Sequence, residues 1–144
     1  MPERPVREIL SRDTLVAGSP ETTVREAAKR MAEHVCGSIV VLEGDSLVGI
    51  FTERDLLTRV IAADRDPDRT RIAEVMTRSP DTIDADAPVK EAVRRMDEFC
   101  YKHLPVTEGG RVIGVVAVED IPIGELVGMC DELEERHKLA ERMW

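Results

Sequence analysis

The sequence has few aromatic residues and no long apolar stretch. Aromatic residues make up 3% of its 144 residues, with one Trp and one Tyr, which leaves little for the stacking platforms that bind single-stranded nucleic acid. The longest apolar run, Val112–Val118, is interrupted by Gly114 and falls short of the roughly 20 residues that cross a bilayer. The opening MPERPVREIL also lacks the apolar stretch of a signal peptide. We therefore expect no membrane association and a cytoplasmic location.

Cysteine and histidine are equally sparse. The three cysteines form no CxxC pair and are odd in number, so they are interpreted as reduced thiols rather than a disulfide framework. The three histidines, His34, His103 and His137, have no cysteine or carboxylate at metal-ligand spacing. No nucleophile has a paired base in the sequence. From these absences we expect that the protein has no metal site and is not an enzyme.

The charge and the length narrow the function classes further. The net charge is −9 and the isoelectric point is about 4.9, which disfavours duplex nucleic acid because its phosphates require a basic surface. A small phosphorylated ligand stays possible, since a few local cations or a helix N-terminus can hold one. The chain is also too short for a (β/α)₈ barrel, which needs roughly 250 residues. We therefore predict no nucleic-acid partner.

The chain contains an internal duplication. Val24 aligns with Val89 at an offset of 65 residues, and TTVREAAKRMAEH then matches APVKEAVRRMDEF without a gap. The same offset aligns SIVVLEGDSLVGI with HLPVTEGGRVIGV, and Asp55 with Asp120. Upstream, VREILSR matches IAEVMTR with a shift of one residue. A unit of about 57 residues buries too little apolar surface to be stable alone, so the two units are expected to pack together.

Each unit is predicted to contain a helix, a hairpin and a second helix. Thr22 or Thr23 caps an apolar helical stripe that starts at Val24, and Pro88 occupies the matching helix start. The hairpin strands are predicted at Ser38–Glu43 with Leu47–Phe51 and at His103–Glu108 with Val112–Ala117, joined by glycine turns. The fold class is α+β. The predicted division is 1–65 for the first unit with its N-terminal segment, 66–71 for a linker, 72–128 for the second unit and 129–144 for a C-terminal helical extension.

Two short motifs resemble those of a known family. The stretch Gly49–Leu56, GIFTERDL, matches the signature of glycine, two apolar residues, Ser or Thr, any two residues and Asp in CBS domains. KHLPV at Lys102–Val106 resembles the second-strand element of the same family. From Val6 to Gly128 the chain thus resembles a pair of CBS domains, known as a Bateman module. The resemblance implies tandem β-α-β-β-α repeats packed sheet to sheet with pseudo-twofold symmetry.

The Thr52–Asp55 pair is the main candidate for ligand binding. Its spacing across a strand-to-helix turn puts a hydroxyl beside a carboxylate, which suits the diol of a ribose. The same spacing is typical of a helix capping box, and spacing alone leaves both interpretations open. The resemblance favours the ribose, since similar CBS pairs use these two positions for an adenosine ligand. Gly49 would let that ligand approach the backbone, while Ala117 replaces the hydroxyl beside Asp120, so the second cleft is expected to be weaker.

Other candidates follow from the resemblance and from position. Arg54, Lys102 and His103 are candidates for phosphate recognition, although Arg54 also suits a surface ion pair and His103 a strand end. The walls of the adenine site are predicted to include four residues that equally suit a core: Val16, Ala17, Ile39 and Val41.

Assembly is predicted from apolar helix faces. We expect a homodimer in which exposed faces meet a second copy, with these residues at the interface: Ala27, Ala28 and Met31, and Ala92, Val93 and Met96. A heptad-like stripe near the C-terminus comprises Leu126, Cys130, Leu133, His137, Ala140 and Trp144.

The resemblance implies a regulatory module rather than a catalyst. It would bind an adenosine-containing ligand, namely AMP, ADP, ATP, NAD or S-adenosylmethionine, without a covalent cofactor, and regulate a protein of unidentified kind. An assembly or adaptor protein without a ligand is an alternative that Ala117 supports. A subunit related to inosine-monophosphate dehydrogenase is another, against which the missing barrel argues.

Overall fold

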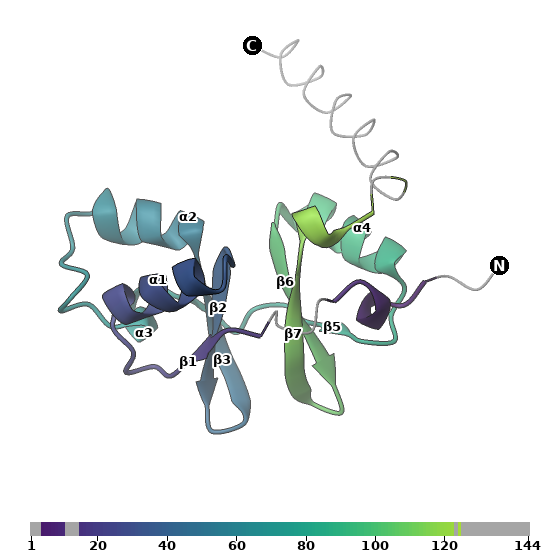
Figure 1. The fold of residues 1–144 in the computed structure, drawn as a ribbon, viewed down its shortest axis with the longest axis horizontal. Coiled ribbons are helices and arrows are strands. Elements are labelled where there is room, and N and C mark those ends of the chain that lie inside the picture. Colours follow the sequence, from purple (N-terminus) through teal and green to yellow (C-terminus); the bar gives the residue numbers. More distant parts are fainter. Residues whose placement is uncertain (1–3, 11–14, 123, 125–144) are drawn as a thin grey trace, which may run out of the picture.

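Each half of the chain forms a small sheet with a helix on its outer face. The computed structural model describes residues 4–10, 15–122 and 124. The two sheets face each other in the middle of the molecule, with α1 and α4 on opposite outer sides (Figure 1). Their strand orders are β1-β2-β3-β4 and β5-β6-β7. The expected α+β pair of units packed sheet to sheet is therefore confirmed, while the C-terminal helix and its heptad stripe lie outside the described residues.

The elements of the first unit follow the local sequence signals. Thr23 caps α1, where its side-chain oxygen accepts a hydrogen bond from the backbone N–H of Glu26 at 3.2 Å. Gly44 has a φ of 63°, which glycine adopts without strain in the hairpin turn. The elements are β1 (Ala17–Gly18), α1 (Val24–Glu33), β2 (Ser38–Glu43), β3 (Ser46–Thr52), α2 (Glu53–Asp55) and the π-helical η2 (Leu56–Ile61).

The second unit repeats this arrangement. Both hairpins carry an irregularity at the same place, between Val41 and Leu42 in one and between Val106 and Thr107 in the other. The leading strands β1 and β5 both run parallel to the first hairpin strand. The elements are α3 (Ile72–Val75), β4 (Thr77–Arg78), β5 (Ile83–Asp84), α4 (Val89–Phe99), β6 (His103–Glu108), β7 (Arg111–Ala117) and η3 (Val118–Asp120).

The leading segment of each unit packs on the other unit. Val6, on η1 (Val6–Glu8), is fully buried in the core of the second unit, and its N–H donates to the carbonyl of Ala87 at 2.8 Å. Ile72, which begins the second repeat, is fully buried in the core of the first unit, and its N–H donates to the carbonyl of Thr22 at 2.8 Å. This exchange of leading segments couples the two units through both cores.

The apolar helix faces that were expected at a dimer interface are inside the units. Ala27 and Met31 belong to the first core, and Ala92 and Met96 to the second, all with 4% or less of their surface exposed. The prediction that these four residues form an exposed face is wrong, because each helix uses its apolar stripe to cover its own sheet. Ala28 and Val93 are half-buried.

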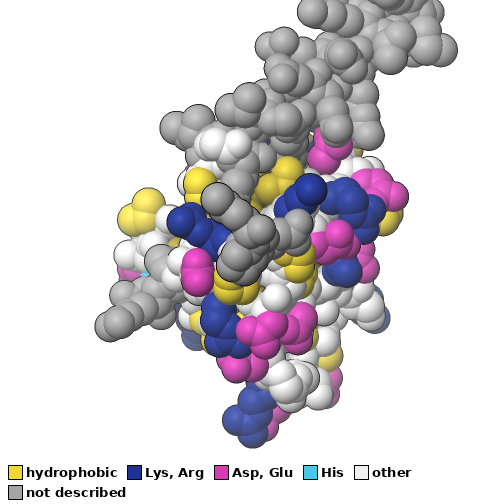
Figure 2. All heavy atoms as spheres, turned by 90° about the vertical axis from the view of Figure 1, so that its right-hand side faces the viewer, with side chains coloured by type: hydrophobic (Ala, Val, Ile, Leu, Met, Phe, Trp, Pro, Cys, Tyr) yellow, Lys and Arg dark blue, Asp and Glu magenta, His cyan; other side chains and the backbone are white. Residues whose placement is uncertain are grey.

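The outer face of the second unit carries charges of both signs. Figure 2 shows lysine and arginine side chains beside aspartate and glutamate side chains over the described part of this face. Arg94 on α4 pairs with Glu91 and Glu98, each at 2.7 Å. Hydrogen bonds from Arg94 and Arg95 hold the pKa of Glu91 at about 2. Such a mixed surface is not the basic face that nucleic-acid phosphates require.

Candidate functional site

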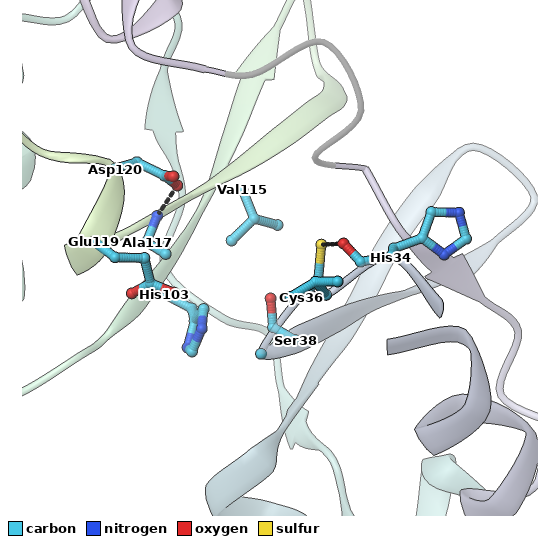
Figure 3. A pocket seen from close by; sticks show the side chains of 10 residues that line it. His34, Cys36, Ser38, His103, Val115, Ala117, Glu119 and Asp120 are labelled. Carbon is cyan, nitrogen blue, oxygen red and sulfur yellow. Dashed lines mark hydrogen bonds between the residues drawn. The ribbon is translucent and has the colours of Figure 1, made fainter. Parts of the chain in front are cut away.

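A cavity of about 230 Å³ lies between the two units. The segment His34–Ser38 of the first unit forms one wall, and β7, η3 and the start of β6 form the other. Figure 3 shows the side chains that line it from the two units. The second-unit residues that line it are His103, Val115, Ala117, Glu119 and Asp120.

The first-unit wall is the turn that follows α1. The Nδ1 of His34 donates to the carbonyl of Arg30 at 2.8 Å, which holds the ring at the helix end. Val35 has a φ of 51°, a conformation that is strained for a β-branched residue, and 92% of its surface is exposed. Burial raises the pKa of the Cys36 thiol, with a further contribution from the charges of Asp120 and Glu119. This wall thus holds a strained, exposed apolar side chain beside a protonated thiol.

The second-unit wall offers a carboxylate. The Oδ2 of Asp120 accepts the backbone N–H of Ala117 at 2.9 Å, which fixes the carboxylate at the start of η3 (Figure 3). Asp120 is half-buried and lines the cavity. Because Ala117 has no hydroxyl, it adds no side-chain hydrogen bond to this carboxylate. Asp120 therefore keeps acceptor capacity for the hydroxyls of a ligand.

His103 lies where the second unit contacts Gly37 of the first unit. A Cβ placed on Gly37 would come within 2.8 Å of its Nε2 and would also collide with the Glu53 carboxylate. This Nε2 is buried and has no hydrogen-bond partner among the described residues. Burial lowers the pKa of His103, although the charges of Glu119, Glu53 and Asp120 act against this effect. The imidazole is therefore neutral at pH 7.

The Thr52–Asp55 pair forms a capping box at the start of α2. The Oδ2 of Asp55 accepts the Thr52 backbone N–H at 3.0 Å and the Thr52 hydroxyl at 3.2 Å. Its Oδ1 lies 3.5 Å from the Nε of Arg59, and only 7% of the Asp55 surface is exposed. Both oxygens are thus engaged, and a ribose contact at this pair stays a prediction.

The other predicted residues are dispersed. Arg54 and Lys102 are exposed and lie outside the lining of this cavity, whereas His103 and Asp120 lie within it. A Cβ on Gly49 would collide with the sulfur of Met76, so the close approach at this glycine is made by the chain itself. Of the predicted adenine walls, Ala17 is half-buried on β1, and three residues lie in the core of the first unit: Val16, Ile39 and Val41. Their contact with a ligand also stays a prediction.

Sequence reasoning missed most of the first-unit wall and the presence of Glu119 in the lining. Cys36 and Val35 lie in a turn without a recognisable motif, and they meet the second unit only through the packing of the two sheets. The duplication holds a usable signal, because the wall His34–Ser38 corresponds to 99–103 in the second repeat, a range that ends at the predicted residue His103.

Neither a metal centre nor a membrane span is found in the described part of the chain. Over residues 4–10, 15–122 and 124, no three His, Cys, Asp or Glu side chains gather in a way that could hold a metal ion. Within the same ranges, no helix has the length and apolar character needed to cross a bilayer.

Comparisons with known proteins agree with this architecture. The CBS domain family matches residues 6–62 and 72–121. A protein of Methanopyrus kandleri is 35% identical over 140 residues, which cover 96% of this chain and 71% of that protein. CBS domain-containing protein CBSCBSPB1 of Arabidopsis thaliana is 43% identical over 101 residues, or 69% of this chain. The match covers only 19% of that plant protein, so this chain spans a small part of its length.

Solved structures give the same result. A conserved protein from Pyrococcus horikoshii superposes with a TM-score of 0.76 at 31% identity, covering 83% of this chain and 90% of its own. A CBS domain protein from Pyrobaculum aerophilum, determined in complex with AMP, superposes with a TM-score of 0.78 at 25% identity, covering 89% and 99%. With the family match over most of both repeats, the chain belongs to the CBS-domain family and is a regulatory module built from two CBS domains.

Proposed function

We propose that this module regulates a partner protein by binding an adenosine-containing ligand in the cavity between its two CBS domains, without catalysis of its own. The observation that carries the proposal is the Asp120 carboxylate, which lines the cavity and is fixed by one hydrogen bond from Ala117. The complex of the related Pyrobaculum aerophilum protein with AMP supports the ligand class. The cytoplasmic location expected from the sequence stays a prediction.

The cavity walls suit the parts of such a ligand. Asp120 can accept hydrogen bonds from both ribose hydroxyls, and bonds to an ionised acceptor are about twice as strong as neutral ones. Val35 and Val115 supply apolar surface for the base, and His103 supplies a ring nitrogen that needs a partner. Since these residues come from both domains, a bound ligand favours one relative position of the domains over others. That shift in population would carry the signal to the regulated protein.

A thermal-shift panel tests the proposal. We expect at least one of adenosine, AMP, ADP, ATP, NAD and S-adenosylmethionine to raise the melting temperature by several degrees. A ligand at 100 times its Kd stabilises the folded state by about 2.7 kcal/mol. Guanosine and GMP are the matched controls, because they carry the same ribose with another base. If none of the adenosine ligands raises the melting temperature, the proposed ligand class is refuted and an assembly role without such a ligand becomes the favoured alternative.

We also propose that two copies of the chain associate, through exposed apolar residues on η2. Leu57 and Ile61 are four residues apart on one helix and are 63% and 55% exposed, and neighbouring exposed apolar side chains of this kind are typical of an interaction surface. Light scattering should give twice the chain mass of 16.1 kDa at micromolar concentration. The double variant Leu57→Glu/Ile61→Glu should give a monomer. An unchanged mass for this variant would place the interface elsewhere, and a monomeric wild type would refute the dimer.

A further inference from the structure

Opposite charges occupy equivalent positions of the two repeats. Arg54 precedes Asp55 in the first domain, and Glu119 precedes Asp120 in the second, at the same offset of 65 residues. Both side chains are exposed, but Glu119 lines the cavity between the domains, whereas Arg54 does not. The cavity thus has an acidic side chain where the first repeat has a basic one.

The other ionisable groups around the cavity leave it negative. Its lining, as far as the structure describes it, contains two carboxylates, two histidines and one cysteine, and neither lysine nor arginine. A third carboxylate, on Glu53 of α2, lies beside His103 at Gly37. Lys102 is the nearest basic neighbour in sequence to His103, but it is exposed and outside the lining.

The same carboxylates act on the pKa values of Cys36 and His103, which lie on opposite walls of the cavity. On the first-domain wall, Asp120 and Glu119 add to the burial that raises the pKa of Cys36. On the second-domain wall, Glu119 is the largest of the three carboxylate effects on His103, yet burial outweighs them and keeps the imidazole uncharged. His34, on the same first-domain wall, has its Nδ1 committed to the Arg30 carbonyl. No group in this lining therefore offers a fixed positive charge to a phosphate.

The cavity has room for a nucleoside. Its volume of about 230 Å³ is below the roughly 300–1,000 Å³ of common ligand pockets. Size does not separate ligands with and without phosphate, but the carboxylate of Glu119 in the lining would repel a phosphate bound beside it.

We propose that this cavity selects its adenosine ligand by charge and takes a ligand without phosphate, either an uncharged nucleoside or one with a cationic group. This inference rests on the proposed binding of adenosine ligands. Glu119 sets the preference by repelling an anion beside the ribose site. Asp120 contributes to affinity for every adenosine ligand, because every one of them presents the ribose diol.

Titrations of wild type and two charge-reversal variants test the inference. Binding in this cavity is followed by the imidazole NMR signal of His103, which is assigned with His103→Gln, so that ligand in another cleft is not counted. We expect adenosine and S-adenosylmethionine to bind the wild type at least tenfold more tightly than AMP and ATP. Glu119→Arg, which installs the residue found at the equivalent position of the first repeat, should bring AMP to at least the affinity of adenosine. Glu119→Gln should narrow the wild-type difference without added bulk.

Glu43→Arg is the matched control. It makes the same change in net charge at an exposed position, at the end of β2 away from the cavity, and should leave the wild-type preference unchanged. AMP binding as tight as adenosine to the wild type, or a preference that Glu119→Arg leaves unchanged, would overturn charge selection while the proposed function stands. If no adenosine ligand moves the His103 signal, the proposed function fails and this inference fails with it.

Discussion

Asp120→Asn should weaken the binding of adenosine ligands by roughly 10- to 100-fold. Asparagine keeps an oxygen that can accept the Ala117 N–H, so the start of η3 is preserved while the charge and one acceptor are lost. A hydrogen bond to a charged partner contributes about 1.5–3 kcal/mol. Since 1.4 kcal/mol corresponds to a factor of ten, the expected loss follows directly. Isothermal titration with the ligand found in the thermal-shift panel measures it.

Asp55→Asn is the informative comparison. Asp55 is 7% exposed, and its oxygens contact Thr52 and Arg59, so we expect this variant to lower the melting temperature more than the ligand affinity. The sequence pattern predicts the reverse order, because it counts the Thr52 hydroxyl as a ribose contact. A large loss of affinity in Asp55→Asn with normal binding by Asp120→Asn would assign the ligand to the first cleft.

Ile72→Ala should destabilise the first domain by about 2–5 kcal/mol, although Ile72 belongs to the second repeat. Its side chain is fully buried in the first core with Val24 and Phe51, so the truncation leaves a cavity there. Urea unfolding gives the loss of stability. Hydrogen exchange should show the earliest loss of protection in β2 and β3.

Two isoleucines serve as controls for this result. Ile83→Ala truncates a residue with 2% exposure in the second core and should release β6 and β7 first. Ile113→Ala, at 37% exposure on β7, should change stability by less than about 0.5 kcal/mol. If Ile72→Ala instead released β6 and β7, the exchange of leading segments between the domains would be refuted.

The elements that carry local signals were predictable in detail. The first hairpin strand was expected at Ser38–Glu43 and occurs there, and Thr23 caps α1 as one of two expected residues. The two glycine turns also occupy their expected positions, at Gly44 and at Gly109–Gly110. Caps, turns and apolar periodicity act within a few residues, so the sequence alone is enough to locate them.

The candidate site was less predictable than the fold. His103 and Asp120 were among the predicted site residues and line the cavity. The cleft of Asp120, however, was expected to bind a ligand more weakly than that of Asp55. The Thr52 hydroxyl, which was expected to help bind a ribose, donates to Asp55 in the structure, and its contact with a ribose stays a prediction. Spacing puts a hydroxyl near a carboxylate, but it does not say whether the two satisfy each other or remain open to a ligand.

The duplication, the element order and the alternation of helix and hairpin in each domain are all encoded in local sequence patterns. The partner domain of each leading segment follows from packing alone, since Val6 packs with the second core and Ile72 with the first. The packing of the two domains also determines where the cavity lies. It brings Glu119 and His103 to the same cavity as the turn at Cys36. Two similar repeats offer nearly equivalent surfaces. Packing across the interface therefore fixes which side chains contact each other and which polar atoms remain without a hydrogen-bond partner.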